Sequence, residues 1–486
     1  MSAATSPKMA TTLATALAAS LLLAGCASPT AGPRAADPAL LQQAGVPAQL
    51  PAQLPAAAGA AAETPAADWR QVVQSPRLAQ WVSLALANNR DLQVALLNVQ
   101  RAQAQLGLAD ANRGPAIGAG LNASRAPNTR GEQANSLSAG LQLSAWEIDL
   151  FGRLANLSEA ARAQLLSTEA GRRAAELSLV ASVLQAGLAL QADEELLALA
   201  RQALASREQT LQLTQLRESV GAASLLELQA QQTLAAQARA SIAQLTRQQA
   251  QDSNALALLL GQPVPADAPG ASRAASQAAT SAMSTSPRLA DEAWLAEVPA
   301  GLSSKVLLAR PDVVAAEQSL RAAQANIAAA RVAWWPTLTL TAQAGQASPQ
   351  LAGLFAGGNF AYTVAAGLAA TVFDGGRRQA GVDVAMANQQ IARAQYERSL
   401  QAAFRETADA LAGLATWRAQ LAAQTAQRDA TRDTARLTEL KASQGAASAL
   451  ERLDAQRALW AAEQALVQVR LGELVNRVAL FKALGR

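Results

Sequence analysis

The sequence predicts a mixed α/β membrane protein in which the strands of a transmembrane β-barrel continue into very long helices. Three observations predict this fold. Four short stretches alternate between apolar and polar side chains, two helical stretches (153–219 and 377–443) run without interruption, and the whole pattern occurs twice along the chain. Alternation over about ten residues has the length and pattern of a transmembrane barrel strand.

The composition favours helices and argues against an enzyme. Hydrophobic residues make up 51% of the chain but aromatic residues only 3%, and alanine, leucine and glutamine dominate. This mix favours long helices that pack through small apolar seams. The chain has no histidine, the commonest general base and transition-metal ligand. We therefore expect no enzymatic activity, no metal site and no cofactor other than a covalent lipid.

Charge and cysteine usage exclude two further classes of protein. The 40 basic and 36 acidic residues are spread along the chain without a basic block, so we expect no nucleic-acid partner. Cys26 is the only cysteine, which excludes a disulfide framework and a cysteine-rich zinc site.

The N-terminus predicts a lipidated, exported protein. An apolar run from Leu13 to Leu23 follows Lys8 and is too short to span a bilayer, so residues 1–25 are expected to be a signal peptide. Leu23-Ala24-Gly25-Cys26 resembles the bacterial lipobox, in which the chain is cut before a cysteine that then carries lipid. Ala27 at the next position implies sorting to the outer membrane. The alternative is an ordinary signal peptide with a chance cysteine. Residues 26–76 are expected to form a lipidated tether.

The remainder of the chain reads as two copies of one unit. A shift of 224 positions, from residue 221 to residue 445, places Gly221-Ala222-Ala223-Ser224 on Gly445-Ala446-Ala447-Ser448, and the same shift places Gly152 on Gly376. Residues 77–261 and 303–486 are therefore expected to be structural repeats. Residues 262–302, rich in proline, serine and alanine, are the expected linker.

Each repeat is expected to begin with a helix (91–112 and 311–332) and to continue into two strands. The alternation covers 117–124 and 136–145 in the first repeat and 337–344 and 362–372 in the second. A single such hairpin could lie on a soluble sheet, but four concordant strands behind a lipidation signal favour a barrel. Aromatic residues near the strand ends are expected either to form a membrane-interface girdle or simply to pack: Trp146, Phe151, Phe360, Tyr362 and Phe373.

Four strands cannot close a barrel, and an open sheet edge in lipid leaves backbone groups without hydrogen bonds. Several chains must therefore assemble. The long helices could reach about 100 Å below the strands, and the return helices that follow them carry a coiled-coil seam. A solid structural coiled coil is the alternative for the helices alone.

The turns between the long and the return helices carry local helix-end signals. Glycine ends a helix well and serine begins one well, so the turns are expected at the far tips. A basic residue four positions before each glycine could complement the helix dipole or contact a partner. The tip residues are Arg217, Gly221 and Ser224 in the first repeat and Lys441, Gly445 and Ser448 in the second.

Several motifs identify a family. The blocks 298–304, 307–313 and 334–336, with the strand-to-helix junctions 146–153 and 373–377, resemble TolC-like outer-membrane efflux lipoproteins, the outer-membrane factors of RND-type tripartite efflux systems. The resemblance runs from residue 26 to residue 486. Trp334 and Trp335 depart from it, since the family more often has phenylalanines there.

The resemblance implies a homotrimer with a twelve-stranded barrel above a helical periplasmic tunnel. It implies docking to a periplasmic adaptor, through the tips, and to an inner-membrane RND-type pump, so that small toxic compounds leave the cell. Two other functions stay open: a duct for protein secretion, and a structural coiled-coil lipoprotein without a channel. The sequence does not name the substrate.

The resemblance also implies a periplasmic gate, with Leu450 forming a hydrophobic ring and Asp454 a carboxylate ring. These residues are four apart and share one side of a helix. The first repeat has Ala230 at the position of Asp454, so the ring would hold three carboxylates. Alternatively, Asp454 is a solvated carboxylate paired with Arg457.

Overall fold

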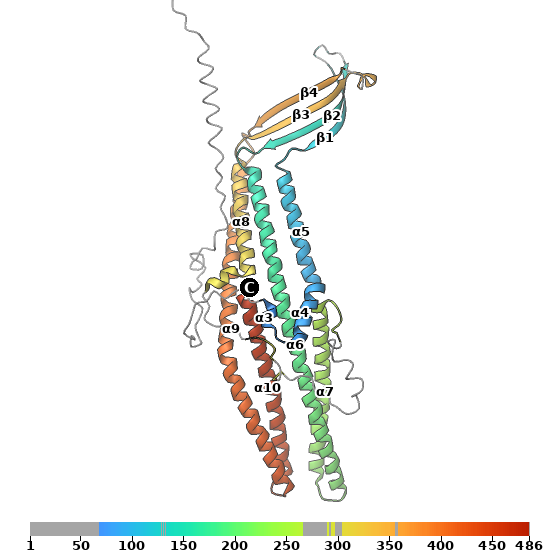
Figure 1. The fold of residues 1–486 in the computed structure, drawn as a ribbon, viewed down its shortest axis with the longest axis vertical. Coiled ribbons are helices and arrows are strands. Elements are labelled where there is room, and N and C mark those ends of the chain that lie inside the picture. The colour runs from blue at the N-terminus through green and yellow to red at the C-terminus, as the bar shows by residue number, and fades with distance from the viewer. Residues whose placement is uncertain are drawn as a thin grey trace, which may run out of the picture.

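The computed structural model describes residues 68–127, 129, 131, 133–265, 289–290, 293–296, 304–354 and 358–485. The signal peptide, Cys26, the tether and most of the linker lie outside these residues. The described chain is elongated, with a sheet at one end and helices along its length. At the other end, two turns each connect a pair of antiparallel helices (Figure 1).

The sheet contains two hairpins, one from each half of the chain. Strands β1 (Ile117–Pro127) and β2 (Gln133–Ile148) form the first, and β3 (Thr337–Ser348) and β4 (Phe360–Ala369) form the second. All neighbours are antiparallel in the order β1-β2-β3-β4, so β2 and β3 join the hairpins. The outer edges of β1 and β4 pair with no described strand.

The register aligns the side chains into one apolar and one polar face. Ile117 pairs with Leu143, Leu143 with Ala342, and Ala342 with Val364, so one row across all four strands is apolar. Because side chains alternate along a strand, the adjacent row lies on the opposite face and is polar or small: Gly118, Gln142, Gln343 and Thr363. The apolar and polar faces predicted strand by strand therefore become two continuous faces.

A β-bulge in β2 corrects the predicted pattern. Simple alternation placed Ala145 on the apolar face, but the register shifts by one residue between Leu143 and Trp146, and Ala145 has a positive φ of 44°. The extra residue reverses the alternation beyond it. Trp146 and Ile148 consequently take the apolar face.

The second hairpin also differs at its end. The predicted strand 362–372 stops at Ala369, because Ala369 pairs with Thr337, the first residue of β3. Pro336 precedes Thr337 and has no N–H to continue the ladder. Val372 is left 96% exposed.

Long helices carry the sheet. The two halves have the same element order, in which a helix, two strands, a long helix and a return helix follow one another. These helices are α5 (Arg90–Ala111), α6 (Arg153–Ser219), α7 (Leu225–Leu260), α8 (Pro311–Val332), α9 (Arg377–Ser443) and α10 (Ala449–Leu484). The short elements are α3 (Trp69–Val72), α4 (Pro76–Asn88), η1 (Ser304–Ala309) and η2 (Leu351–Gly353). At about 1.5 Å per residue, α6 and α9, with 67 residues each, are about 100 Å long.

The main hydrophobic core lies at mid-height, where α4 packs against α6 and α7. Leu78 and Trp81 of α4 are buried against Gly187 of α6, where a Cβ would collide with both side chains. Of the described helices, only α6 is long and apolar enough to qualify as a candidate membrane span, and half of its apolar window is buried inside the protein. A core helix has these properties, so they are weak evidence that α6 crosses a membrane.

Candidate functional site

The turn at the first tip is closed by its own backbone. The N–H of Gly221 donates to the carbonyl of Glu218 at 2.9 Å, and the N–H of Ala222 donates to Arg217 at 2.7 Å. This pair of hydrogen bonds requires a residue in the left-handed conformation after the helix, and Gly221 has φ +74°. Ser224 then caps α7 by accepting the N–H of Glu227 at 3.1 Å.

The second tip repeats this construction. Gly445 has φ +72°, and the N–H of Ala446 donates to the carbonyl of Lys441 at 2.8 Å. Ser448 caps α10 as Ser224 caps α7, and Glu451 in addition completes a capping box by accepting the N–H of Ser448 at 2.7 Å. These bonds to Ser448 lower the pKa of Glu451.

The structure therefore brings the predicted tip residues together at the end of the molecule farthest from the sheet (Figure 1). The left-handed backbone explains the glycine in each turn, and the side-chain cap of the next helix explains the serine. The side chains of Arg217, Ser224, Lys441 and Ser448 are exposed. The geometry leaves them available to a partner.

The predicted gate residues lie on the first turns of α10. Leu450 is 64% exposed, and the Asp454 carboxylate lies 3.3 Å from Arg457. Both side chains of this ion pair are about half exposed, so the pair alone holds Asp454 weakly. A single chain thus presents both gate residues to solvent, with the Asp454–Arg457 pair that the alternative interpretation requires.

A buried arginine above the predicted gate residues was missed in the sequence. Arg207 of α6 is 7% exposed, donates to the carbonyl of Leu234 on α7 at 3.0 Å, and stacks on Trp460 of α10 at 5.1 Å. Burial and the nearby positive charge of Arg457 lower the pKa of Arg207. This contact joins the helix pair α6–α7 to the helix pair α9–α10, just above the predicted gate residues.

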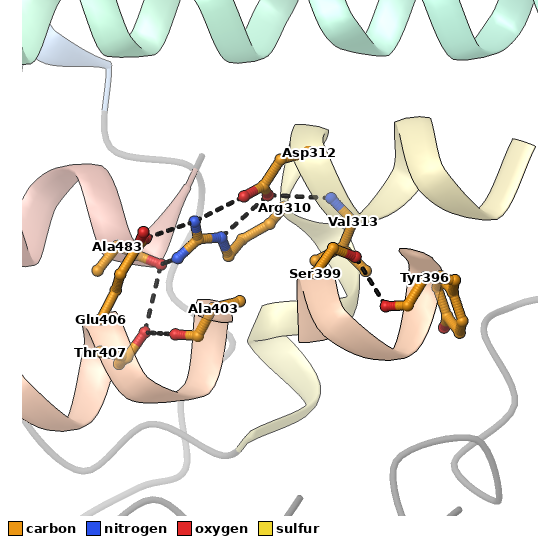
Figure 2. Close-up of polar contacts among 9 residues, drawn as sticks. All are labelled: Arg310, Asp312, Val313, Tyr396, Ser399, Ala403, Glu406, Thr407 and Ala483. Atoms are coloured by element: carbon orange, nitrogen blue, oxygen red, sulfur yellow. Dashed lines mark hydrogen bonds and ion pairs between the residues drawn. The ribbon is translucent and has the colours of Figure 1, made fainter. Parts of the chain in front are cut away.

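A second buried arginine joins the start of α8, the middle of α9 and the end of α10. Arg310 is 4% exposed and binds Asp312 at 2.8 Å, Glu406 of α9 at 2.9 Å and the carbonyl of Ala483 on α10 at 2.9 Å (Figure 2). Burial opposes its charge, but Asp312 and Glu406 outweigh burial and raise its pKa. Arg310 belongs to block 307–313, one of the motifs on which the family resemblance rests. Its contacts give that block a structural role.

Two carboxylates face each other between α6 and α7. Asp193 is 7% exposed and lies beside Asp252, and its Oδ2 has no hydrogen-bond partner within the described residues. Burial, followed by Asp252 and Glu194, raises the pKa of Asp193 to about 7. A count along the chain could have revealed the pair, because Asp193 precedes Gly221 by 28 residues and Asp252 follows Ser224 by 28.

Cys26 lies outside the described residues. Among the described residues, no group of three or more histidine, cysteine, aspartate or glutamate side chains could hold a metal ion.

Known proteins match this chain over most of its length. The sequence profile described as "outer membrane efflux protein" matches residues 81–262 and 302–486. The chain is 40% identical over 433 residues to the toluene efflux pump outer membrane protein TtgC of Pseudomonas putida, covering 87% of this chain and 86% of TtgC. It is 37% identical over 425 residues to outer membrane protein OprJ of Pseudomonas aeruginosa, with 86% of each chain covered.

A solved structure shares the fold. The open state of the MtrE outer membrane channel of Neisseria gonorrhoeae superimposes with a TM-score of 0.78 at 32% identity. The match covers 90% of this chain and 96% of that channel.

Proposed function

This chain belongs to the outer membrane efflux protein family, and from that premise we propose that it forms the outer-membrane channel of a tripartite efflux pump. The observation that carries the proposal is the sheet, which has one continuous apolar face, one polar face and two unpaired edges. Such a sheet suits a barrel wall between lipid and a water-filled lumen. The long helices continue the wall into the periplasm.

Three copies would close the wall. Unpaired edges in lipid are costly, and in a closed ring β4 of one copy would run antiparallel to β1 of the next, because the strands alternate in direction in the order β1-β2-β3-β4. Twelve strands would result from a homotrimer. Exposed apolar side chains on α5 and α9 support contact between copies in the helical region: Val94, Leu97 and Leu108 on α5, and Val384 and Ile391 on α9.

The tips suit contact with a periplasmic adaptor that links the channel to an inner-membrane RND-type pump. The turns 221–224 and 445–448 are the points farthest from the sheet, and their exposed side chains have no structural duty beyond capping. A relative is named for toluene efflux, which supports small toxic compounds as the cargo of this chain. Leu450 and Asp454 would form the gate at the same end. A lipid on Cys26 would add a second anchor.

Two measurements, one on a deletion strain and one on the purified protein, test the function. Deletion of the gene should raise sensitivity to small toxic compounds, and the purified full-length protein should conduct ions in planar bilayers. Loss of export of one polypeptide without a change in sensitivity would favour a secretion duct. A protein without conductance would be a structural lipoprotein. Mass spectrometry of the mature chain should find acyl chains on Cys26.

A further inference from the structure

The level at which helices meet strands carries unpaired positive charge. The carboxylates named next, at this level, form ion pairs or hydrogen bonds within the chain. Glu147 pairs with Arg153 at 2.6 Å, and Asp374 pairs with Arg378 at 2.7 Å. Asp149 caps α6 by accepting the N–H of Ala155 at 2.7 Å, and Asp110 accepts the Ser158 hydroxyl.

Three arginines at this level remain without such partners. Arg113 follows α5, Arg331 lies in the last turn of α8, and Arg377 begins α9. All three side chains are exposed, and within the described part of the chain none forms an ion pair. Three uncompensated cations per chain therefore stand at one height.

Large apolar side chains are exposed at the same level as these cations. Trp335 is 60% exposed and stacks on Phe151 at 5.1 Å, which joins the two repeats. Trp334 is 50% exposed under the guanidinium of Arg378, and Phe373 is 88% exposed. Amphipathic aromatic side chains favour the boundary between acyl chains and headgroups.

We propose that Arg113, Arg331 and Arg377, here called the arginine belt, bind the phosphate groups of phospholipids in the inner leaflet of the outer membrane. The apolar face of the sheet ends at this level, so the belt lies at headgroup height on the periplasmic side. Guanidinium groups match phosphate oxygens in geometry and charge. Trp334, Trp335 and Phe373 would contact the acyl chains of the same lipids.

We assign the phosphate to a lipid and not to a free ion, because exposed apolar side chains stand at the same level as the cations and the acyl chains of a lipid would cover them. The belt lies at the opposite end of the helices from the tips and includes no gate residue. Binding at the belt therefore rests on the placement of the sheet in the outer membrane and not on the gate or the adaptor.

Lipid retention tests the proposal directly. The full-length trimer is prepared in nanodiscs of phosphatidylethanolamine and phosphatidylglycerol, and native mass spectrometry counts the phospholipids that stay bound. The combined variant Arg113→Gln, Arg331→Gln and Arg377→Gln should lose retained lipid severalfold. The corresponding Arg→Lys variant should keep most of it, because lysine still offers a cation to phosphate.

A matched control separates the belt from bulk charge. Arg101→Gln, Arg247→Gln and Arg398→Gln together change the net charge equally, at exposed arginines lower on the helices. This control should retain lipid like the wild type. Equal losses in both triple variants, or no loss in the belt variant, would overturn the proposal.

Two further outcomes also count against lipid binding. If the belt variant binds less inorganic phosphate than the wild type but retains lipid equally well, the belt is a site for a free anion. If the belt variant falls apart into monomers, the arginines lie between copies of the chain. Conductance of the belt variant should equal that of the wild type, so failure of the channel function would appear separately, in the wild-type recording.

Discussion

Arg239 on α7 contacts Glu208 on α6 at 2.7 Å, and the second repeat makes the same contact with the charges exchanged. There Arg432 stands at the position of Glu208 and Glu463 at the position of Arg239, 2.9 Å apart. Correct pairing within each repeat thus joins opposite charges. Pairing α6 with α10 would place Glu208 against Glu463, and pairing α9 with α7 would place Arg432 against Arg239. The exchange opposes mispairing between two similar helix pairs.

Exchanging the first pair, as Glu208→Arg with Arg239→Glu, should therefore lower the yield of correctly folded protein on refolding. The native contact is kept, and exposed pairs contribute only about 0.5 kcal/mol, so the stability of protein already folded should change little. Refolding yield and urea midpoint measure the two effects. The reverse exchange in the second repeat, combined with the first, should restore the yield. An unchanged yield in the first variant would remove this role.

Gly140 and Gly345 should be irreplaceable at the join between the two hairpins. They pair across β2 and β3, where a Cβ on either would overlap the backbone of the other strand. Gly140→Ala should cost toward the upper end of the about 1–3 kcal/mol of overpacking, because backbone cannot yield as a side chain does. Gly118→Ala is the control, since its nearest atom would lie at 3.9 Å. Heat-modifiability of the folded protein on gels compares the two variants, and equal behaviour would contradict the close approach of β2 and β3.

The sequence predicted what depends on local signals. Glycine with φ > 0 and capping serine placed both tip turns, and uninterrupted helical residues placed α6 and α9 at their observed bounds. The bulge at Ala145 could not be predicted, because Leu143 and Ala145 continue a plausible alternation and only pairing with β3 breaks it. The contact of Arg207 with Trp460 joins residues of different repeats, which no local pattern relates.

Asp193 should make stability depend on pH. Its pKa is raised from 3.8 in the unfolded chain to about 7 in the fold, so between these values the folded protein holds a proton that the unfolded chain has lost. Stability should therefore fall as pH rises from 3.8 to about 7 and level off above. Asp193→Asn should remove this component, and its thermal midpoint relative to wild type should rise over that range.

Asp252→Asn is the companion variant, because Asn476 holds the equivalent position in the second repeat. It should lower the pKa of Asp193 by removing a negative neighbour. Glu194, which Arg77 binds at 3.2 Å, remains in both variants. Parallel pH profiles for wild type and Asp193→Asn would show that the pair does not titrate in this range.

The stack of Arg207 on Trp460 should stabilise the contact between the two helix pairs. A desolvated cation–π contact contributes about 2 kcal/mol, whereas an exposed ion pair contributes about 0.5 kcal/mol. Arg207→Leu should thus lower the urea midpoint more than Arg239→Gln, an exposed arginine on α7 at a similar height. In a double-mutant cycle, adding Trp460→Leu should cost little further. Additive losses would mean that the two side chains stabilise the fold independently.

Single-channel conductance tests the predicted gate at Leu450 and Asp454. In a trimer, three Leu450 side chains would form a hydrophobic constriction and three Asp454 carboxylates a ring that favours cations. Leu450→Ala and Asp454→Ala should each raise the single-channel conductance, and the aspartate variant should also weaken cation selectivity. Arg457→Gln separates the gate from the ion pair, because it frees Asp454 from its partner at 3.3 Å and keeps the carboxylate. A ring carboxylate released in this way should strengthen cation selectivity, whereas a carboxylate that only pairs with Arg457 in solvent would leave selectivity unchanged.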